Sequence, residues 1–433
     1  MLFISALTPA ARDESTCKAD IEFALDELEK RCGHFFQQKK IDWKRVRKEM
    51  LKASKKVETD EEHHELLWRL LARLRDGHAR VDKIGAGKEI RDPERWSNQT
   101  GIGMFLCRSG EKILIKSSWN VAASNGIEPG MELVKVDGVA IGKWIPKEIE
   151  RLRDEWSFST DQHAFGFLTT KGLWREPGTR LKLELRTSKG KKKSRTLTYK
   201  RSTSSAFGPA FFPPGLESAG ESVKYGKVPE GFGYIHLRRI RRGLLDEVDT
   251  ALERIGNVPG LILDFRANSG GGCDHDALLG RFVPHGENLK RASAYPIPSA
   301  GSHPYGGPVV VIVDSNVVSA GETTSGMFKE DGRGYMIGDG MTAGMSSQKE
   351  TINLPSGLFA LYVSVASNKR RFNGGRGIEG IGIEPHEIVE YDQEDLEQGV
   401  DTLTQRAVEL LRDFPQRKVP YQPDKHGWKP GPE

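Results

Sequence analysis

Residues 308–322, PVVVIVDSNVVSAGE, decide the fold class of this chain. The stretch opens with an unbroken apolar run over 309–313, which is typical of a strand buried on both faces of a sheet. A polar turn then leads to Ser319, and the small residues and Glu322 that follow favour the start of a helix. The N-terminus of a helix favours negative charge, so this serine is well placed for use as a nucleophile. By itself, however, the motif also fits an ordinary helix N-cap.

A second stretch, GLILDFRANSGGG at 260–272, shows the same pattern of an apolar strand followed by a turn. An apolar strand ends at Asp264 and runs into a glycine-rich turn. Such a turn can point several backbone N–H groups at one spot and hold an anion. No Gly-Lys-Ser/Thr follows and G-x-G-x-x-G is not satisfied, so the common nucleotide-binding patterns are excluded. The alternative is a turn that only needs glycine for its positive φ.

The rest of the chain predicts a multidomain α/β protein. Apolar strands separated by helices after residue 232 indicate a mostly parallel sheet covered on both faces. Residues 17–76 show helical periodicity, and short strands and turns fill 100–201. A last helix is predicted over 398–413. The expected parts are an N-terminal helical region, a β-rich domain, an α/β core and a loose C-terminal tail, at residues 1–98, 99–201, 202–415 and 416–433.

Composition excludes several classes of function. The chain has 433 residues and a net charge of +5, from 65 basic and 60 acidic residues. Basic runs at 189–193 and 238–242 stand among acidic residues and are interpreted as solvated surface, so no nucleic-acid partner is expected. No apolar stretch is long enough to span a membrane. The apolar residues 1–11 end in small residues, which fits the remainder of a secretory signal and an exported protein, although a basic start is missing.

The cysteines do not predict a metal site. None of the four forms a C-x-x-C pair, so no zinc and no other metal or cofactor is expected. Cys17 and Cys32 fit either a disulfide in an oxidising compartment or two buried thiols.

A third motif is Asp76-Gly77-His78, at the end of a predicted helix. A histidine beside an acid suits a general base, although a capping or surface histidine fits as well.

Taken together, these motifs resemble the C-terminal-processing (tail-specific) serine peptidases. The match runs from about residue 60 to residue 400, and the segments that carry it stand in the family's order: 75–78, 264–271, 314–322 and 377–385. The resemblance implies a crotonase-like, ClpP-type core, with Ser319 as the nucleophile. It also implies an endopeptidase that acts on unfolded or C-terminally exposed polypeptides and has no cofactor.

The inserted segment resembles a PDZ domain. Residues 100–104, TGIGM, are similar to the loop whose amides hold a peptide's terminal carboxylate, and 126–138 are similar to the middle of that fold. The resemblance implies a polypeptide partner bound through its C-terminal segment as an added strand. The peptide-binding residues that it implies are Gly101, Ile102, Gly103 and Met104.

One departure from the family pattern indicates which branch of the family the chain resembles. Members with a Ser–Lys dyad carry the lysine in a turn that corresponds to 341–346, and this turn, MTAGMS, has none. The chain therefore resembles the tricorn-like branch, which implies His78 as the base and Glu379 as its orienting group, with Asp76 as the alternative. Gly77 stands where that branch has a relay serine. The resemblance implies an oxyanion hole formed by Ala320 together with a glycine of the turn, which is Gly270 or Gly271.

A Ser–His pair predicts activity that falls as His78 becomes protonated at mildly acid pH. The rival hypotheses are a non-catalytic peptide- or ligand-binding protein on the same fold, and a scaffold that only binds partner C-termini.

Overall fold

The computed structural model divides into two compact units. The first consists of residues 1–97, 153–158 and 348–366, and the second of the remainder. The structure describes residues 14–92, 98–201, 207–289, 295–369 and 371–414. The apolar stretch 1–11 and the tail 416–433 therefore lie outside the described residues.

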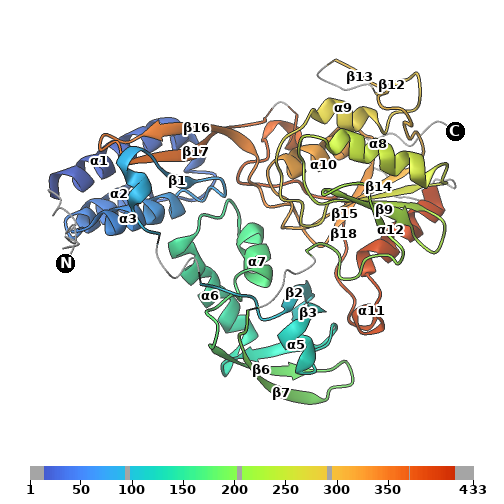
Figure 1. Cartoon of the computed structure of the whole chain (residues 1–433), viewed down its shortest axis with the longest axis horizontal. Coiled ribbons are helices and arrows are strands. Elements are labelled where there is room, and N and C mark those ends of the chain that lie inside the picture. Colours follow the sequence, from blue (N-terminus) through green and yellow to red (C-terminus); the bar gives the residue numbers. More distant parts are fainter. Residues whose placement is uncertain (1–13, 93–97, 202–206, 290–294, 370, 415–433) are drawn as a thin grey trace, which may run out of the picture. The chain divides into compact units, whose positions relative to one another are not determined.

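The first unit packs three helices against a small sheet (Figure 1). Its elements are α1 (Glu14–Cys32), η1 (Gly33–Phe35), α2 (Trp43–Ser54), α3 (Asp60–Ala72), β1 (Arg80–Lys83), η2 (Gly85–Glu89), β16 (Ser347–Asn353) and β17 (Phe359–Ser367). Asp42 caps α2, where its side chain accepts a hydrogen bond from the Arg45 N–H at 3.0 Å. Thr59 and Glu62 form a capping box at the start of α3.

The late strands of this unit correct one expected boundary. The sequence predicts that 348–366 belong to the α/β core, but β17 pairs antiparallel with β1, with Arg80 opposite Tyr362. Figure 1 shows β16 and β17 (orange) beside the blue helices α1 to α3. Side chains from both parts form one buried core, for example Leu67 and Leu361. A strand pairing between segments so distant in sequence leaves no local pattern to read.

The structure of the first unit also shows whether Cys17 and Cys32 form a disulfide. Cys17 and Cys32 are both buried and both are thiols, so no disulfide joins them.

The second unit begins with an antiparallel β domain. Its elements are β2 (Met104–Ser109), β3 (Lys112–Ser118), α5 (Asn120–Ser124), β4 (Glu132–Val136), β5 (Val139–Ala140), α6 (Ile141–Glu155), α7 (Asp161–Thr170), β6 (Arg180–Arg186) and β7 (Lys192–Thr198). The strand order is β2-β3-β4-β6-β7, and β5 pairs with β4. A tight turn joins β4 and β5, where Asp137 and Gly138 both have positive φ, at 50° and 80°.

The α/β core of this unit has a mixed, mostly parallel sheet, as predicted. Its strand order is β18-β15-β14-β11-β10-β9-β8, with β8 and β9 antiparallel at one edge. The strands are β8 (Glu217–Ser218), β9 (Val223–Lys227), β10 (Gly233–Leu237), β11 (Leu261–Asp264), β14 (Val309–Val313), β15 (Tyr335–Gly338) and β18 (Glu387–Ile388). The other elements are α8 (Leu244–Ile255), α9 (His275–Gly280), β12 (Asn288–Leu289), β13 (Ile297–Pro298), α10 (Ala320–Glu330), η3 (Asn373–Gly375), α11 (Gln393–Gln398) and α12 (Thr402–Asp413).

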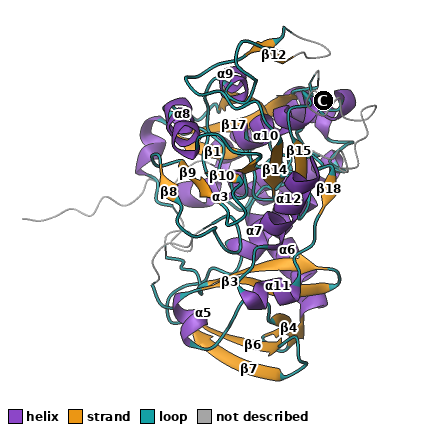
Figure 2. Cartoon of the chain, turned by 90° about the vertical axis from the view of Figure 1, so that its right-hand side faces the viewer, coloured by secondary structure: helices purple, strands orange, loops and turns teal. Residues whose placement is uncertain are grey.

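Helices cover both faces of this sheet. Along β14, Val311 packs in the cluster that contains α8, whereas Val310 packs in the cluster that contains α12. Figure 2 shows α8 and α12 on different sides of the strands. Because both faces are buried, the strands are continuously apolar, which is the pattern that the sequence displayed.

The predicted helix over 398–413 is wrong at its start. Gln398 ends α11, Gly399 follows with φ 77°, and α12 begins at Thr402. The left-handed glycine ends one helix, and the side chain of Asp401 caps the next by accepting a hydrogen bond from the Thr404 N–H at 2.9 Å.

Within the described residues, no helix combines the length and the apolar character that crossing a bilayer requires.

Candidate active site

Ser319 lies at the sharp turn between β14 and α10. It is the N-cap of α10, with φ 56° and ψ −125°, a backbone conformation that side-chain-bearing residues rarely adopt. The chain around it is tied down, because Val318 N donates to Asn268 O at 3.0 Å and Ala343 N donates to Val317 O at 3.1 Å. A serine on a strained strand-to-helix turn is an arrangement that presents a nucleophilic hydroxyl.

Glu322, on the first turn of α10, holds this turn in place. Its carboxylate is fully buried, and Oε2 accepts hydrogen bonds from Ser319 N at 3.1 Å and Met345 N at 2.8 Å. Oε1 accepts from Thr342 Oγ1 at 2.7 Å and Gly344 N at 2.6 Å. Burial raises the pKa of Glu322 to about 8, while these hydrogen bonds act in the opposite direction. The residue thus joins the serine turn to the turn at 341–346, a role that the sequence did not reveal.

The glycine-rich turn after β11 packs directly against the serine. A Cβ atom added to Gly270 would lie 2.7 Å from Ser319 Cβ and 2.9 Å from Val318 O. Since real side chains do not approach so closely, glycine is required at this position. The neighbouring Gly271 pairs with Ile240, whose N–H donates to Gly270 O at 2.9 Å and whose carbonyl accepts from Gly272 N at 2.8 Å.

These contacts distinguish the two candidate oxyanion donors. Gly270 N already donates to Asn268 Oδ1 at 2.9 Å. In contrast, the N–H groups of Gly271 and Ala320 have no acceptor within the part of the chain that the structure describes. Ala320 is the first residue of α10, where helical N–H groups have no partner in the helix. The geometry therefore favours Gly271 over Gly270 as the partner of Ala320.

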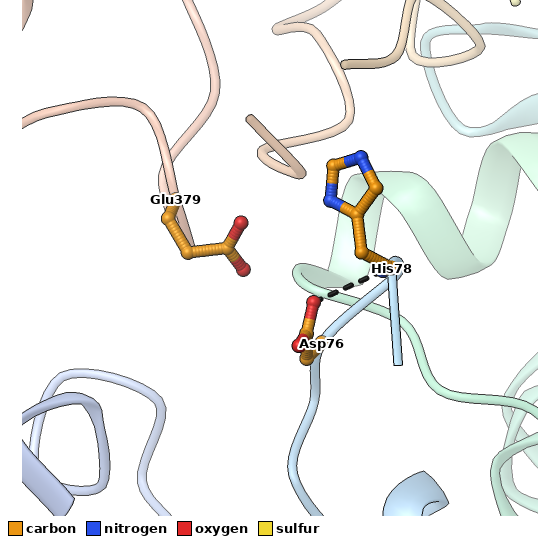
Figure 3. Close-up of side chains that lie close together, drawn as sticks. All are labelled: Asp76, His78 and Glu379. Carbon is orange, nitrogen blue, oxygen red and sulfur yellow. Dashed lines mark hydrogen bonds between the residues drawn. The ribbon is translucent and has the colours of Figure 1, made fainter. Parts of the chain in front are cut away.

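His78 belongs to the first unit, on the turn between α3 and β1. Asp76 Oδ1 accepts hydrogen bonds from His78 N at 3.0 Å (dashed line in Figure 3) and from Ser364 Oγ at 2.8 Å. Asp76 Oδ2 accepts from Ser364 N at 2.7 Å. Asp76 therefore fixes the backbone of His78 against β17.

Burial lowers the pKa of the His78 imidazole to about 4, against the opposing effect of the negative charge on Asp76. The imidazole is therefore neutral over a wider range of pH than the sequence analysis assumed, and neutral imidazole is the form that accepts a proton.

Glu379 belongs to the second unit and its side chain is fully buried. Ser159 Oγ donates a hydrogen bond to Glu379 Oε1 at 3.0 Å, and Glu379 N donates to Ser367 Oγ at 3.1 Å. The motif at 76–78 has no relay serine, because Gly77 occupies the position next to the histidine. Ser159 is a serine in contact with Glu379, but it lies 220 residues away in sequence, and no local pattern marks it.

The loop expected to bind a peptide carboxylate has three consecutive amides to offer. The N–H groups of Gly101, Ile102 and Gly103 have no acceptor among the residues that the structure describes. Their carbonyls are used instead, since Gly103 O accepts from Trp119 N at 2.7 Å and Ile102 O from Ala122 N at 3.1 Å. Successive amides of this kind form a concavity suited to an anion.

Comparisons with known proteins show which protein family the core of the chain is similar to. Residues 231–389 match the sequence profile of "Peptidase family S41". Tricorn protease of Thermoplasma acidophilum is 26% identical over 188 residues, which cover 41% of this chain and 16% of that protein. The chain thus corresponds to about a sixth of the length of that relative.

Two solved structures share the fold. Mature CPAF complexed with lactacystin has a TM-score of 0.68 at 14% identity, covering 93% of this chain and 98% of that one. Mature CPAF has a TM-score of 0.67 at 13% identity, covering 93% and 97%. The profile match over residues 231–389, the similarity to tricorn protease and the shared fold confirm the resemblance found in the sequence, and the core of the chain is similar to peptidase family S41.

Proposed function

We propose that this chain is a serine endopeptidase that cleaves polypeptides with Ser319 as its nucleophile. The observation that carries the proposal is the strained turn at Ser319. There a serine with φ 56° caps α10 and is packed against Gly270, beside a turn that offers the unused amides of Gly271 and Ala320. Such amides can stabilise the negative charge that develops on a peptide carbonyl during acyl transfer.

In the proposed reaction, neutral His78 accepts the proton of the Ser319 hydroxyl as its oxygen attacks the scissile carbonyl. The N–H groups of Gly271 and Ala320 bind the resulting oxyanion. The imidazolium then gives its proton to the leaving amine, and water hydrolyses the acyl-enzyme by the same steps. The proposal requires the imidazole to come within hydrogen-bonding distance of Ser319 Oγ, about 2.6–3.2 Å.

Two other groups act on the base rather than on the substrate. Glu379 is the proposed orienting group for the imidazolium, and the Ser159 hydroxyl holds its carboxylate. Asp76 is assigned to positioning the backbone of His78, because it accepts a hydrogen bond from His78 N and is itself held by the amide and hydroxyl of Ser364.

The proposed substrates are unfolded or C-terminally exposed polypeptides. The β domain at 99–201 would act as a PDZ-like module, with a peptide's terminal carboxylate on the amides of Gly101 to Gly103 and its backbone along β2. The three unused amides support this assignment. Binding that persists when a peptide's C-terminus is amidated would contradict it.

The test is digestion of an unstructured protein by the wild type, Ser319→Ala and His78→Ala, together with labelling by a serine-directed fluorophosphonate. We expect turnover and labelling at Ser319 in the wild type, and loss of turnover in both variants. Circular dichroism of the variants checks that they remain folded. A folded wild type that neither cleaves nor labels would support the rival hypothesis of a binding protein on this fold.

A further inference from the structure

A small cavity in the second unit lies beside the proposed active site and has no role in the mechanism above. It opens at the carboxyl end of β10, where Arg238 follows the last strand residue, Leu237. The lining residues that bear on its chemistry are Phe207, Phe212, Ser222, Lys224, His236 and Arg238.

The backbone connects this cavity to the glycine-rich turn. Arg238 O accepts a hydrogen bond from Ser269 N at 3.0 Å, and Ser269 directly precedes Gly270, which packs against Ser319. In the sheet, β10 and β14 are separated by β11 alone, so their ends lie about 10 Å apart at two strand spacings. An extended peptide covers that distance in about three residues.

The mouth of the cavity carries an excess of positive charge. Arg238 and Lys224 are both exposed, and neither has an ion-pair partner among the described residues. Glu221 also lines the cavity, but its carboxylate is paired with Arg241. Lys224 lies over the ring of Phe212, at 4.6 Å from its centroid, which places the ammonium group above an apolar wall.

The floor of the cavity holds a polar group that the protein leaves unsatisfied. Ser222 is 2% exposed, and its Oγ has no hydrogen-bond partner within the described part of the chain. Buried hydroxyl groups in folded proteins are normally paired, so this hydroxyl is available to a group that binds in the cavity. His236 Nε2 lies 3.0 Å from Arg266 O, and since a carbonyl only accepts, Nε2 carries the hydrogen and Nδ1 is left as an acceptor.

We propose that this cavity is a substrate subsite that binds a carboxylate of the polypeptide, about three residues from the scissile bond. Arg238 and Lys224 would pair with the carboxylate, the Ser222 hydroxyl would donate to it, and Phe207 and Phe212 would contact its methylene groups. The inference rests on the proposed peptidase function, because it uses the scissile bond at Ser319 as its reference point. It assigns to this chain a preference for acidic sequences.

The experiment compares C-terminally amidated fluorogenic peptides that carry glutamate or glutamine at each position around the scissile bond. We expect glutamate at one position to raise kcat/KM about tenfold over glutamine, which is the ratio given by one charge-assisted contact. In Arg238→Gln this ratio should fall towards one. Arg239→Gln is the matched control, because Arg239 is an exposed neighbour that does not line the cavity, and it should keep the wild-type ratio.

A second arm identifies the source of the carboxylate. Glutamine peptides that end at the selected position are compared as free acids and as amides. If the free acid is cleaved faster than the amide and this difference is lost in Arg238→Gln, the cavity binds the carboxylate of a chain terminus. If only glutamate peptides show a dependence on Arg238, the cavity binds a side-chain carboxylate. A preference for the acid that Arg238→Gln leaves intact belongs to another part of the chain and counts against the cavity.

A binding measurement separates failure of the subsite from failure of the peptidase. The same peptides are titrated against Ser319→Ala by fluorescence anisotropy, with and without Arg238→Gln. If the wild type cleaves nothing but glutamate still tightens binding about tenfold through Arg238, the peptidase proposal is wrong and the carboxylate site stands. If neither cleavage nor binding distinguishes glutamate from glutamine, the subsite is refuted.

Discussion

The pH dependence of the proposed peptidase tests whether burial of His78 controls its base. Burial lowers the pKa of this imidazole to about 4 from an ordinary value of 6.5. At pH 5 a group with a pKa of about 4 is roughly nine-tenths neutral, whereas an ordinary histidine is only about 3% neutral. We therefore expect a rate that stays flat from pH 8 to pH 5 and falls with a midpoint near 4. The expectation from the sequence, a loss at mildly acid pH, would instead hold for a histidine with an ordinary pKa.

The assay is the rate at which a fluorophosphonate labels Ser319, followed together with kcat/KM for a short peptide between pH 3.5 and 8. Removing a nearby positive charge with Lys349→Gln should raise the midpoint, because the charge of Lys349 lowers the pKa of His78. A wild-type midpoint near 6.5 would refute the reasoning, since it would mean that the imidazole titrates as if it were in water.

Acid unfolding must be measured in parallel. Because the pKa of His78 is lower in the folded chain, the unfolded chain binds a proton more readily between pH 6.5 and 4, and stability falls as pH drops through this window. The loss from this group is at most about 3 kcal/mol. Circular dichroism at each pH shows whether the labelled protein is still folded.

Three further predictions concern groups that shape the site. Glu322→Ala removes the acceptor of four donors, and the two that are buried cost about 1–3 kcal/mol each when left without a partner. Urea denaturation should therefore show a loss of at least about 2 kcal/mol, and a loss below about 1 kcal/mol would contradict this role. Gly271→Ala places a Cβ 1.6 Å from a backbone oxygen and should lower kcat by about 100-fold, whereas Gly272→Ala meets nothing within 4 Å and should retain activity. Burial alone would raise the pKa of Asp264, but the positive charge of Arg266 lowers it to about 2. The stability that the Asp264–Arg266 pair gives should therefore disappear as pH falls from 4 to 2. Asp264→Asn should cost about 3–5 kcal/mol at neutral pH and remove that acid-dependent part; an unchanged acid profile would show that the pair does not titrate in this range.

The local patterns of the sequence determined the core fold. Five consecutive apolar residues at 309–313 predicted a strand buried on both faces, and β14 is central in the sheet with residues packed on each side. An Asp-Gly pair is typical of a tight turn, and both Asp137 and Gly138 have positive φ. The same kind of local signal marked Gly399, which the helix prediction over 398–413 overlooked.

Hydrogen-bond partners were decided only by the tertiary structure. The sequence left Gly270 and Gly271 as equal candidates for the oxyanion hole, and Asn268 separates them by occupying the N–H of Gly270. It also left Asp76 as an alternative orienting group, and the structure shows that the carboxylate of Asp76 accepts hydrogen bonds from Ser364 on β17.

The sequence likewise could not predict which charged groups are buried. Glu322 was visible only as an acidic residue in a first helical turn, whereas its four donors come from two separate turns. Backbone conformation and apolar periodicity depend on residues within a few positions of each other, so the sequence determines them. The partner and the pKa of a buried polar group depend on segments that folding brings together from distant positions, and only the tertiary structure decides them.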